Sequence, residues 1–209
     1  MKIALYVLLY LKMGTSFVHD LCVVGAGGGL GRELVYQAIN DRNNTVLALT
    51  TSDKIYKPYR GDTYNDIKEM PEFYSSLLTV DNYWKKMDYS YKSLVICVGG
   101  LPFKVDYSDN LTAKCLENLP NMCKDVSIVS AYSVEDNSLE KFSIPFQIMS
   151  NFYLKDVYRS KRNQETILKK YSKTIIRKKC YKPRALSYGN TFLPSTTRRD
   201  LAKEILDAI

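Results

Sequence analysis

Short apolar runs recur along the chain and are separated by stretches with helical spacing. Four of these runs, residues 17–25, 45–50, 93–99 and 126–131, are nearly continuous in apolar side chains, which is typical of strands buried on both faces. After Leu30, apolar side chains recur three and four residues apart, as on one face of a helix. Strands that alternate with helices predict an α/β fold, with a doubly wound and mostly parallel sheet between two layers of helices.

The remaining elements are shorter or more polar. Residues 77–80 predict a brief third strand and residues 173–176 a sixth, while residues 133–150 show no regular spacing. Long helices are predicted over residues 151–171 and, at the end of the chain, 199–209. Together these elements predict a single three-layer domain, because the whole chain is of ordinary domain length.

An extension, residues 1–16, precedes the predicted domain of residues 17–209. Its apolar run is shorter than a membrane span, and no clear small-residue cleavage site follows it. A signal-like segment, an added strand or helix, and a start of the protein at Met13 remain open interpretations. Five cysteines without a close pair favour reduced thiols and a cytoplasmic location. With a single histidine, the chain is not expected to bind a metal.

Five glycines stand between the first predicted strand and the next helix, in the segment LCVVGAGGGLGRELVYQAI. Gly25, Gly28 and Gly31 have the spacing G-x-x-G-x-x-G, with Gly27 and Gly29 as additional members. Glycines let the chain reverse tightly and bring backbone N–H groups close to a pyrophosphate, and the following helix presents its positive N-terminus to the same group. In this strand–helix context the turn indicates dinucleotide binding and a Rossmann-like fold. The alternative is a tight turn that binds nothing.

The end of the second strand bears on the choice between NAD and NADP. NAD-binding domains place an acid there for the ribose 2′-hydroxyl, but Thr50 and Thr51 occupy that place and Asp53 comes later. Arg32, directly after the last glycine, and Lys54 are suited to a 2′-phosphate. We therefore predict NADP(H) rather than NAD(H), although both cations would also suit a solvated surface.

The order of motifs resembles that of atypical short-chain dehydrogenases. VVGAGGGLGRELV is followed by VICVGG at the fourth strand, IVSAYS at the fifth, KRNQETILKKYSKTIIRK and finally RRDLAKEIL. The resemblance is to the NAD(P)H-binding, NmrA-like and flavin/biliverdin-reductase-like branch, and it covers residues 18–209. Lys161, Glu165 and Arg177 carry the branch-specific part, whereas Lys178 departs from it, because that branch usually has a proline there. Lys161 and Glu165 also have the spacing of a simple surface ion pair.

This resemblance implies a cofactor site along the carboxyl ends of the strands. It implies that Asp81 meets the adenine amino group, and that Gly99 and Gly100 let the chain pass close to a ribose. It also implies that Ser130 and Lys161 line the cofactor. With the glycine turn, the predicted cofactor-binding residues are Gly25, Gly28, Gly29, Leu30, Gly31, Arg32, Thr50, Asp81, Gly99, Gly100, Ser130 and Lys161.

Reductases of this superfamily often use a tyrosine as proton donor with a lysine four residues later, and that pattern is incomplete here. Val157 stands four residues before Lys161. Tyr158 precedes Arg162 by four, but an arginine keeps its charge and has a different geometry. Tyr158 is therefore interpreted as an aromatic that packs the helix. The candidate catalytic residues are Ser130, Tyr132 and Lys161.

Two functions fit these residues. In the first, the chain is an NAD(P)H-dependent reductase with an unidentified acceptor; the cofactor supplies hydride and the pocket positions a small molecule, so that no tyrosine acid is required. In the second, it binds NADP(H) without turnover and reports redox state to a protein partner, as the resemblance to NmrA-like regulators implies. The two differ in whether NADPH is consumed.

The formal charge of +8 is concentrated in one segment. Residues 155–184 hold twelve Lys and Arg against two acids, which leaves the rest of the chain near neutrality. Such a segment attracts phosphates, nucleic acid or acidic lipid, or it is simply the solvated side of a basic helix. No recognised nucleic-acid-binding motif is present, so neither nucleic acid nor a membrane is an expected partner. The pattern does not define an oligomeric state.

Overall fold

The computed structural model describes most of the predicted domain: residues 18–51, 55, 58, 77–83, 89–99, 106–131, 134, 144–171, 177–183, 186–187 and 196–209. The predicted site residues Gly100 and Tyr132, and the extension of residues 1–16, lie outside that part. Within it, strands alternate with helices as the sequence predicts. All five cysteines are described and carry free thiols.

Six strands form one sheet, in which each of the described pairings is parallel. Their spatial order is β3-β2-β1-β4-β5-β6, so the chain starts at the centre, moves outward to β3 and then returns to the other side of β1. In this doubly wound order, ligands bind beside the carboxyl ends of the strands where the direction reverses. The strands are β1 (Val18–Val24), β2 (Val46–Thr50), β3 (Leu78–Asn82), β4 (Ser90–Ile96), β5 (Asp125–Val129) and β6 (Arg177–Tyr181).

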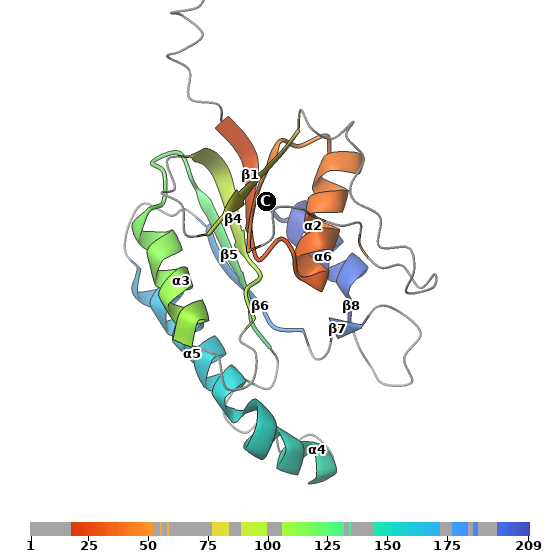
Figure 1. The fold of residues 1–209 in the computed structure, drawn as a ribbon, viewed down its shortest axis with the longest axis vertical. Coiled ribbons are helices and arrows are strands. Elements are labelled where there is room, and N and C mark those ends of the chain that lie inside the picture. Colours follow the sequence, from red (N-terminus) through yellow and green to blue (C-terminus); the bar gives the residue numbers. More distant parts are fainter. Residues whose placement is uncertain are drawn as a thin grey trace, which may run out of the picture.

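Helices cover both faces of this sheet (Figure 1). On one face lie α2 (Gly29–Asn40) and α6 (Arg198–Asp207), which contact each other. On the other lie α3 (Asp106–Glu117) and α5 (Lys155–Lys170), which also pack together. A short helix and a π-helical turn lead directly into α5, and a small two-stranded ladder precedes α6. These elements are α4 (Ile144–Met149), η4 (Ser150–Leu154), β7 (Leu186–Ser187) and β8 (Thr196–Thr197).

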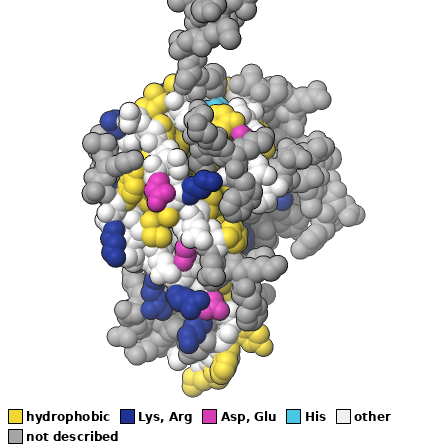
Figure 2. All heavy atoms as spheres, turned by 60° about the vertical axis from the view of Figure 1, so that its left-hand side comes forward, with side chains coloured by type: hydrophobic (Ala, Val, Ile, Leu, Met, Phe, Trp, Pro, Cys, Tyr) yellow, Lys and Arg dark blue, Asp and Glu magenta, His cyan; other side chains and the backbone are white. Residues whose placement is uncertain are grey.

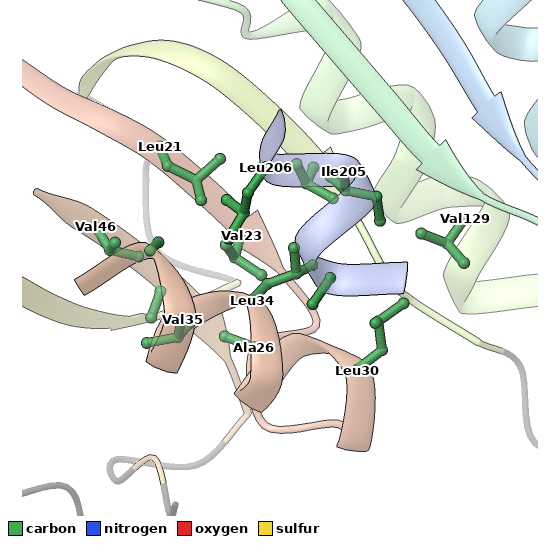
Figure 3. Close-up of a cluster of buried hydrophobic side chains, with 14 of the residues drawn as sticks. Leu21, Val23, Ala26, Leu30, Leu34, Val35, Val46, Val129, Ile205 and Leu206 are labelled. Atoms are coloured by element: carbon green, nitrogen blue, oxygen red, sulfur yellow. The ribbon is translucent and has the colours of Figure 1, made fainter. Parts of the chain in front are cut away.

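Burial on both faces explains the nearly continuous apolar strands. In β1, Leu21 and Val23 point toward α2 and α6, where Leu34 meets them in one buried cluster (Figure 3). The neighbouring Cys22 and Val24 join the opposite cluster, against α3 and α5. Because successive side chains of a strand point to opposite faces, a strand that is covered twice is apolar at most positions.

The sixth strand differs from its prediction. It runs over Arg177–Tyr181, later than the predicted residues 173–176, and residues 172–176 lie outside the described part. Four of its five residues are exposed, and Tyr181 is the buried one. An edge strand has a partner on one side only, and lysines there protect the free edge against pairing with other chains. The apolar criterion therefore misplaces this strand.

An ion pair holds β6 in register. Arg177 lies opposite Asp125 of β5, and its guanidinium donates from Nε to Oδ1 at 2.5 Å and from Nη2 to Oδ2 at 2.8 Å. The two-bond geometry fixes direction as well as distance. Arg177, which the resemblance linked to a branch-specific motif, thus links β6 to β5 where both strands begin. This end of the sheet is called its amino edge below.

Candidate functional site

The glycine turn joins β1 to α2 at the point where the strand order reverses. β1 pairs with β2 on one side and with β4 on the other, and the chain leaves in both directions from there. The carboxyl ends of β1 and β4 are in register through Val24 and Ile96. The turn after β1 and the segment after β4, which contains Gly99, therefore emerge side by side, where open parallel sheets bind ligands.

Two of the glycines are required by the packing of the chain itself. Gly25 has φ of +89°, a left-handed conformation that side chains rarely adopt. A Cβ on Gly31 would lie 2.2 Å from the Gly25 carbonyl oxygen and 2.7 Å from Ala26 Cα. Gly31 thus lets α2 approach the end of β1 closely, which is the role of the third glycine in dinucleotide-binding turns. Neither constraint by itself requires a ligand.

Gly28 and Gly99 are less constrained than these two by the described residues around them. Gly28 is exposed, caps α2 with an extended backbone, and has a φ of −75° that any residue can adopt. Among the described atoms, a Cβ there would meet only the Gly25 carbonyl oxygen, at a tight 3.2 Å, and one on Gly99 would meet none within 4 Å. The first turn of α2 receives no side-chain cap from Gly28. The described residues thus leave backbone uncovered at both positions, and Gly28 at the N-terminus of α2 fits a diphosphate.

The residues around the turn brace it. Gly29 and Leu30 begin α2, and the Leu30 side chain is buried in the core, so only its backbone can face a ligand. Arg32 donates from Nε to the Gly27 carbonyl at 2.8 Å, which holds the guanidinium beside the turn. Thr50 is buried at the end of β2, and its Oγ1 would lie 2.7 Å from a Cβ on Gly27. Thr50 thus packs against the turn.

Asp81, predicted to meet an adenine, is held by neighbours at the end of β3. Its Oδ1 accepts the backbone N–H of Asn82 at 2.7 Å, and its Oδ2 accepts the hydroxyl of Tyr89. This hydrogen bond, aided by burial, raises the pKa of Tyr89 to about 12. Because Tyr89 directly precedes β4, Asp81 links the end of β3 to the start of β4.

Ser130 belongs to a buried network at the end of β5. Its hydroxyl donates to Glu165 Oε1 at 2.5 Å, and Lys182 Nζ reaches Glu165 Oε2 at 3.2 Å. Ser130 and Glu165 are both buried. The Ser130 proton therefore points toward a carboxylate, which leaves the hydroxyl oxygen as an acceptor for any group in the crevice.

Lys161 ties the ends of two central strands together. Its Nζ donates to Val98 O at 2.6 Å, to Val129 O at 2.8 Å and to Gln164 Oε1 at 3.2 Å. These three acceptors match the three protons of an ammonium group. Burial lowers the pKa of Lys161 to about 8. The alternative interpretation, a surface ion pair between Lys161 and Glu165, is wrong, because both side chains are buried.

Sequence reasoning missed a polar network that supports this lysine between α3 and α5. Ser108 and Ser160 share a hydrogen bond of 2.8 Å, and Ser160 Oγ donates to Asp109 Oδ1 at 2.5 Å. Gln164, which also accepts from Lys161, donates to Ser160 Oγ at 3.4 Å. Ser160 and Gln164 are four residues apart on the buried side of α5, and this polar pair within a core-facing pattern was the available signal.

Two tyrosines near the glycines were also missed. Tyr107, in the first turn of α3, donates its hydroxyl to Gly99 O at 3.3 Å and is partly exposed. Tyr83, directly after β3, is buried beside the Gly25 backbone, and burial raises its pKa. By contrast, Tyr158 is buried in the helix packing, as the sequence predicts. Neither missed tyrosine belongs to a periodic apolar pattern, so spacing alone did not identify them.

A cavity of about 760 Å³ lies at the opposite, amino edge of the sheet. Three ion pairs, Arg42–Asp207, Lys92–Asp20 and Arg177–Asp125, contribute to its walls or lie beside them. Its cations are thus largely neutralised by the chain itself. The glycine turn lies at the other end of the strands.

Comparisons with known proteins support the fold. No family model and no curated protein matches this chain. A short-chain dehydrogenase/reductase (wide type) from Veillonella parvula, solved with NADP, is similar with a TM-score of 0.60 and 11% identity, over 90% of this chain and 86% of the other. A putative NADH-flavin reductase from Streptococcus pneumoniae has a TM-score of 0.56 and 12% identity, over 90% and 91%.

A third similar structure is the UDP-N-acetylglucosamine 4-epimerase from Bacillus cereus, with a TM-score of 0.55 and 19% identity, over 90% of this chain and 72% of the epimerase. At such identities the likeness establishes the architecture. The chain has the Rossmann-like fold of short-chain dehydrogenases, as its sequence predicts.

Proposed function

We propose that this protein is an NADP(H)-dependent reductase that passes hydride to a small-molecule acceptor. The observation that carries the proposal is Gly28 at the uncapped N-terminus of α2, where a Cβ would approach a single described atom, the Gly25 carbonyl oxygen. A similar fold has been solved with NADP. Bare backbone at the switch point of a doubly wound sheet is what a diphosphate needs.

The described residues suggest how the nucleotide would be held. The backbone of residues 27–31 would receive the pyrophosphate. The end of β2 offers Thr50 and Thr51, so among the described residues no acid stands there for a 2′-hydroxyl, and Arg32 is fixed beside the turn. These features favour NADP(H) over NAD(H). Tyr107 and Gly99 would border the nucleotide beside the carboxyl end of β4.

The chain's own residues favour an acceptor that needs no proton from a tyrosine. When bound, the nicotinamide supplies the hydride. Tyr158 is buried in helix packing, Lys161 uses its protons on strand carbonyls, and Ser130 donates to Glu165. Flavins and quinones suit such a site, because a reduced flavin or quinone can take its proton from water, and the protein then only needs to hold the two rings together.

The same residues support a second candidate function, in which NADP(H) is bound without turnover and reports redox state to a protein partner. Measuring the loss of NADPH absorbance with flavins, quinones and carbonyls separates the two. The reductase predicts consumption with at least one acceptor class, and the Gly28→Val variant would abolish it. Binding of NADPH without consumption by any of them would favour the sensor, and consumption that Gly28→Val leaves unchanged would contradict the proposed site.

A further inference from the structure

The helical segment of residues 144–170 extends past the body of the molecule. It is built from α4, the π-helical turn η4 and α5, which follow one another without a break. Figure 1 shows α4 at the lower end, beyond the strands. Among the described elements, the main packing partner of α4 is η4, and only α5 lies against the sheet and α3. The beginning of this segment is thus a protruding tip.

This tip carries large apolar side chains that face solvent. Ile144 is 71% exposed, Ile148 55%, Phe152 77% and Tyr153 63%. These four residues, here called the apolar tip, are the most exposed of the large apolar side chains in the described part of the chain. Folding does not bury these side chains, and a group of exposed apolar side chains is typical of a surface that contacts a partner or a membrane.

Basic side chains continue the same exposed side along α5. Spacings of three and four residues lead from Phe152 to Lys155, Arg159 and Arg162, and then to the end of the helix. Figure 2 shows hydrophobic side chains at the lower end of this face and Lys and Arg side chains above them. The exposed basic residues of α5 are Lys155, Arg159, Arg162, Lys169 and Lys170.

We propose that this segment docks the protein on an anionic lipid surface, with the apolar tip inserted among the lipids and the α5 cations at the headgroups. An apolar end joined to a basic side is what holds interfacial helices on acidic membranes. Isoleucines do not stack on bases, so Ile144 and Ile148 disfavour nucleic acid as the partner. A protruding tip, unlike a groove, offers little area to a protein.

This partner was not expected from the sequence, because spacing alone does not reveal which isoleucines remain exposed. No helix in the described ranges has both the length and the apolar character of a membrane span. Docking through this segment leaves the glycine turn untouched, so the proposal does not depend on nucleotide binding.

Sedimentation with lipid vesicles tests the docking. The full chain is mixed with vesicles of phosphatidylcholine alone or of phosphatidylcholine with phosphatidylserine. We expect it to pellet with the anionic vesicles only, and the bound fraction to fall as salt is added, because salt screens surface charges. A protein that stays in the supernatant with both vesicle types at low salt would overturn the proposal.

Paired variants separate insertion from attraction. Ile148→Ser with Phe152→Ser should weaken vesicle binding at least about tenfold, because two apolar side chains that would be inserted into the lipid are lost. Met122→Ser, a partly exposed apolar residue at the amino edge of the sheet, is the matched control and should bind as the wild type does. For charge, Lys155→Gln with Lys169→Gln should weaken binding, whereas Lys124→Gln with Lys203→Gln should not.

Three outcomes would contradict lipid docking. Vesicle binding that is unchanged in Ile148→Ser/Phe152→Ser would exclude insertion of the tip. Tighter binding to single-stranded RNA than to vesicles, lost in Lys155→Gln/Lys169→Gln, would identify a nucleic-acid surface instead. A dimer in analytical ultracentrifugation that the serine variant converts to a monomer would identify a second copy as the occupant. Unfolding midpoints equal to that of the wild type confirm that the variants are folded.

Discussion

Gly31 and Gly28 lie three residues apart in the same turn, but different constraints act on them. A methyl group on Gly31 would enter the backbone of Gly25 and Ala26, whereas one on Gly28 would approach a single carbonyl oxygen. Gly31 is therefore a packing residue. Among the described residues, Gly28 is much less constrained than Gly31, and this contrast makes it possible to separate stability from binding.

We predict that Gly31→Ala lowers the free energy of unfolding by about 3 kcal/mol, because an overpacked site must shift backbone rather than a flexible side chain. Gly28→Ala and Gly99→Ala should each stay within about 1 kcal/mol of the wild type, since surface changes away from strained sites have small effects. Urea unfolding of the three variants provides the comparison. Equal losses at positions 31 and 28 would show that the turn has a different geometry.

Lys161 makes a prediction that depends on pH. An ordinary lysine titrates near 10.5, but burial lowers the pKa of Lys161 to about 8. Below about pH 8 both the folded and the unfolded chain hold this proton, and the cost of burying the charge is fully present. Between about pH 8 and 10.5 the unfolded chain holds the proton and the folded chain releases it, so this group's contribution to stability rises with pH.

The destabilisation caused by Lys161→Met should therefore grow between about pH 7.5 and about pH 9.5 when both proteins are unfolded with urea. The variant removes the titrating group, and its two strand carbonyls lose a charged partner. Lysine-selective NMR should give a titration midpoint near 8. A midpoint close to 10.5, or a stability difference that does not change with pH, would mean that the ammonium is solvated.

The packing of α3 against α5 depends on polar contacts as well as on apolar ones. Ser160 lies at the centre, where it contacts Ser108, Asp109 and Gln164. Ser160→Ala should cost about 2 kcal/mol of stability, because the buried Ser108 and Gln164 and the half-buried Asp109 each lose a hydrogen bond. Thr166→Ala, on the exposed side of the same helix, removes one bond to the Arg162 carbonyl and should cost less than about 0.5 kcal/mol. Similar losses in both variants would contradict this network.

The elements that could be predicted from the sequence are those whose burial leaves a periodic signal. β1, β2, β4 and β5 are buried on both faces, and α2 and α6 have one apolar side each, so apolar spacing located all six. β6 is an edge strand of exposed lysines, and α4 exposes its isoleucines, so burial left no signal in either. Apolar spacing therefore identifies the elements that the fold buries and misses those that stay exposed.

The candidate site was predictable only in part for the same reason. Glycines stand out in a sequence because they are needed where backbone approaches backbone or a ligand, and the turn after β1 was found in this way. The partners of Lys161 are two main-chain carbonyls, Val98 O and Val129 O. Main-chain acceptors have no sequence signature, since their position follows from strand register. Which atoms a buried lysine contacts thus becomes known only once the sheet is assembled.

The molecule as a whole has two unlike edges. At the amino edge, carboxylates and cations pair with each other around a cavity. At the carboxyl edge, the glycine turn and Gly99 lie close to Lys161, which links the ends of β4 and β5. The doubly wound order brings these segments together although they are far apart in the chain. If the protein uses a nucleotide, that edge is where the binding energy is available to stabilise the fold.

Thermal unfolding with NADPH, NADP⁺, NADH and NAD⁺ measures directly how far each nucleotide stabilises the folded protein. A ligand present at about 100 times its Kd stabilises the folded state by about 2.7 kcal/mol, or about 5–10 °C for a domain of this size. We predict such a shift with NADPH and NADP⁺, a smaller one with NADH and NAD⁺, and none in a folded Gly28→Val variant. The absence of a shift with all four nucleotides would contradict a nucleotide site at the glycine turn.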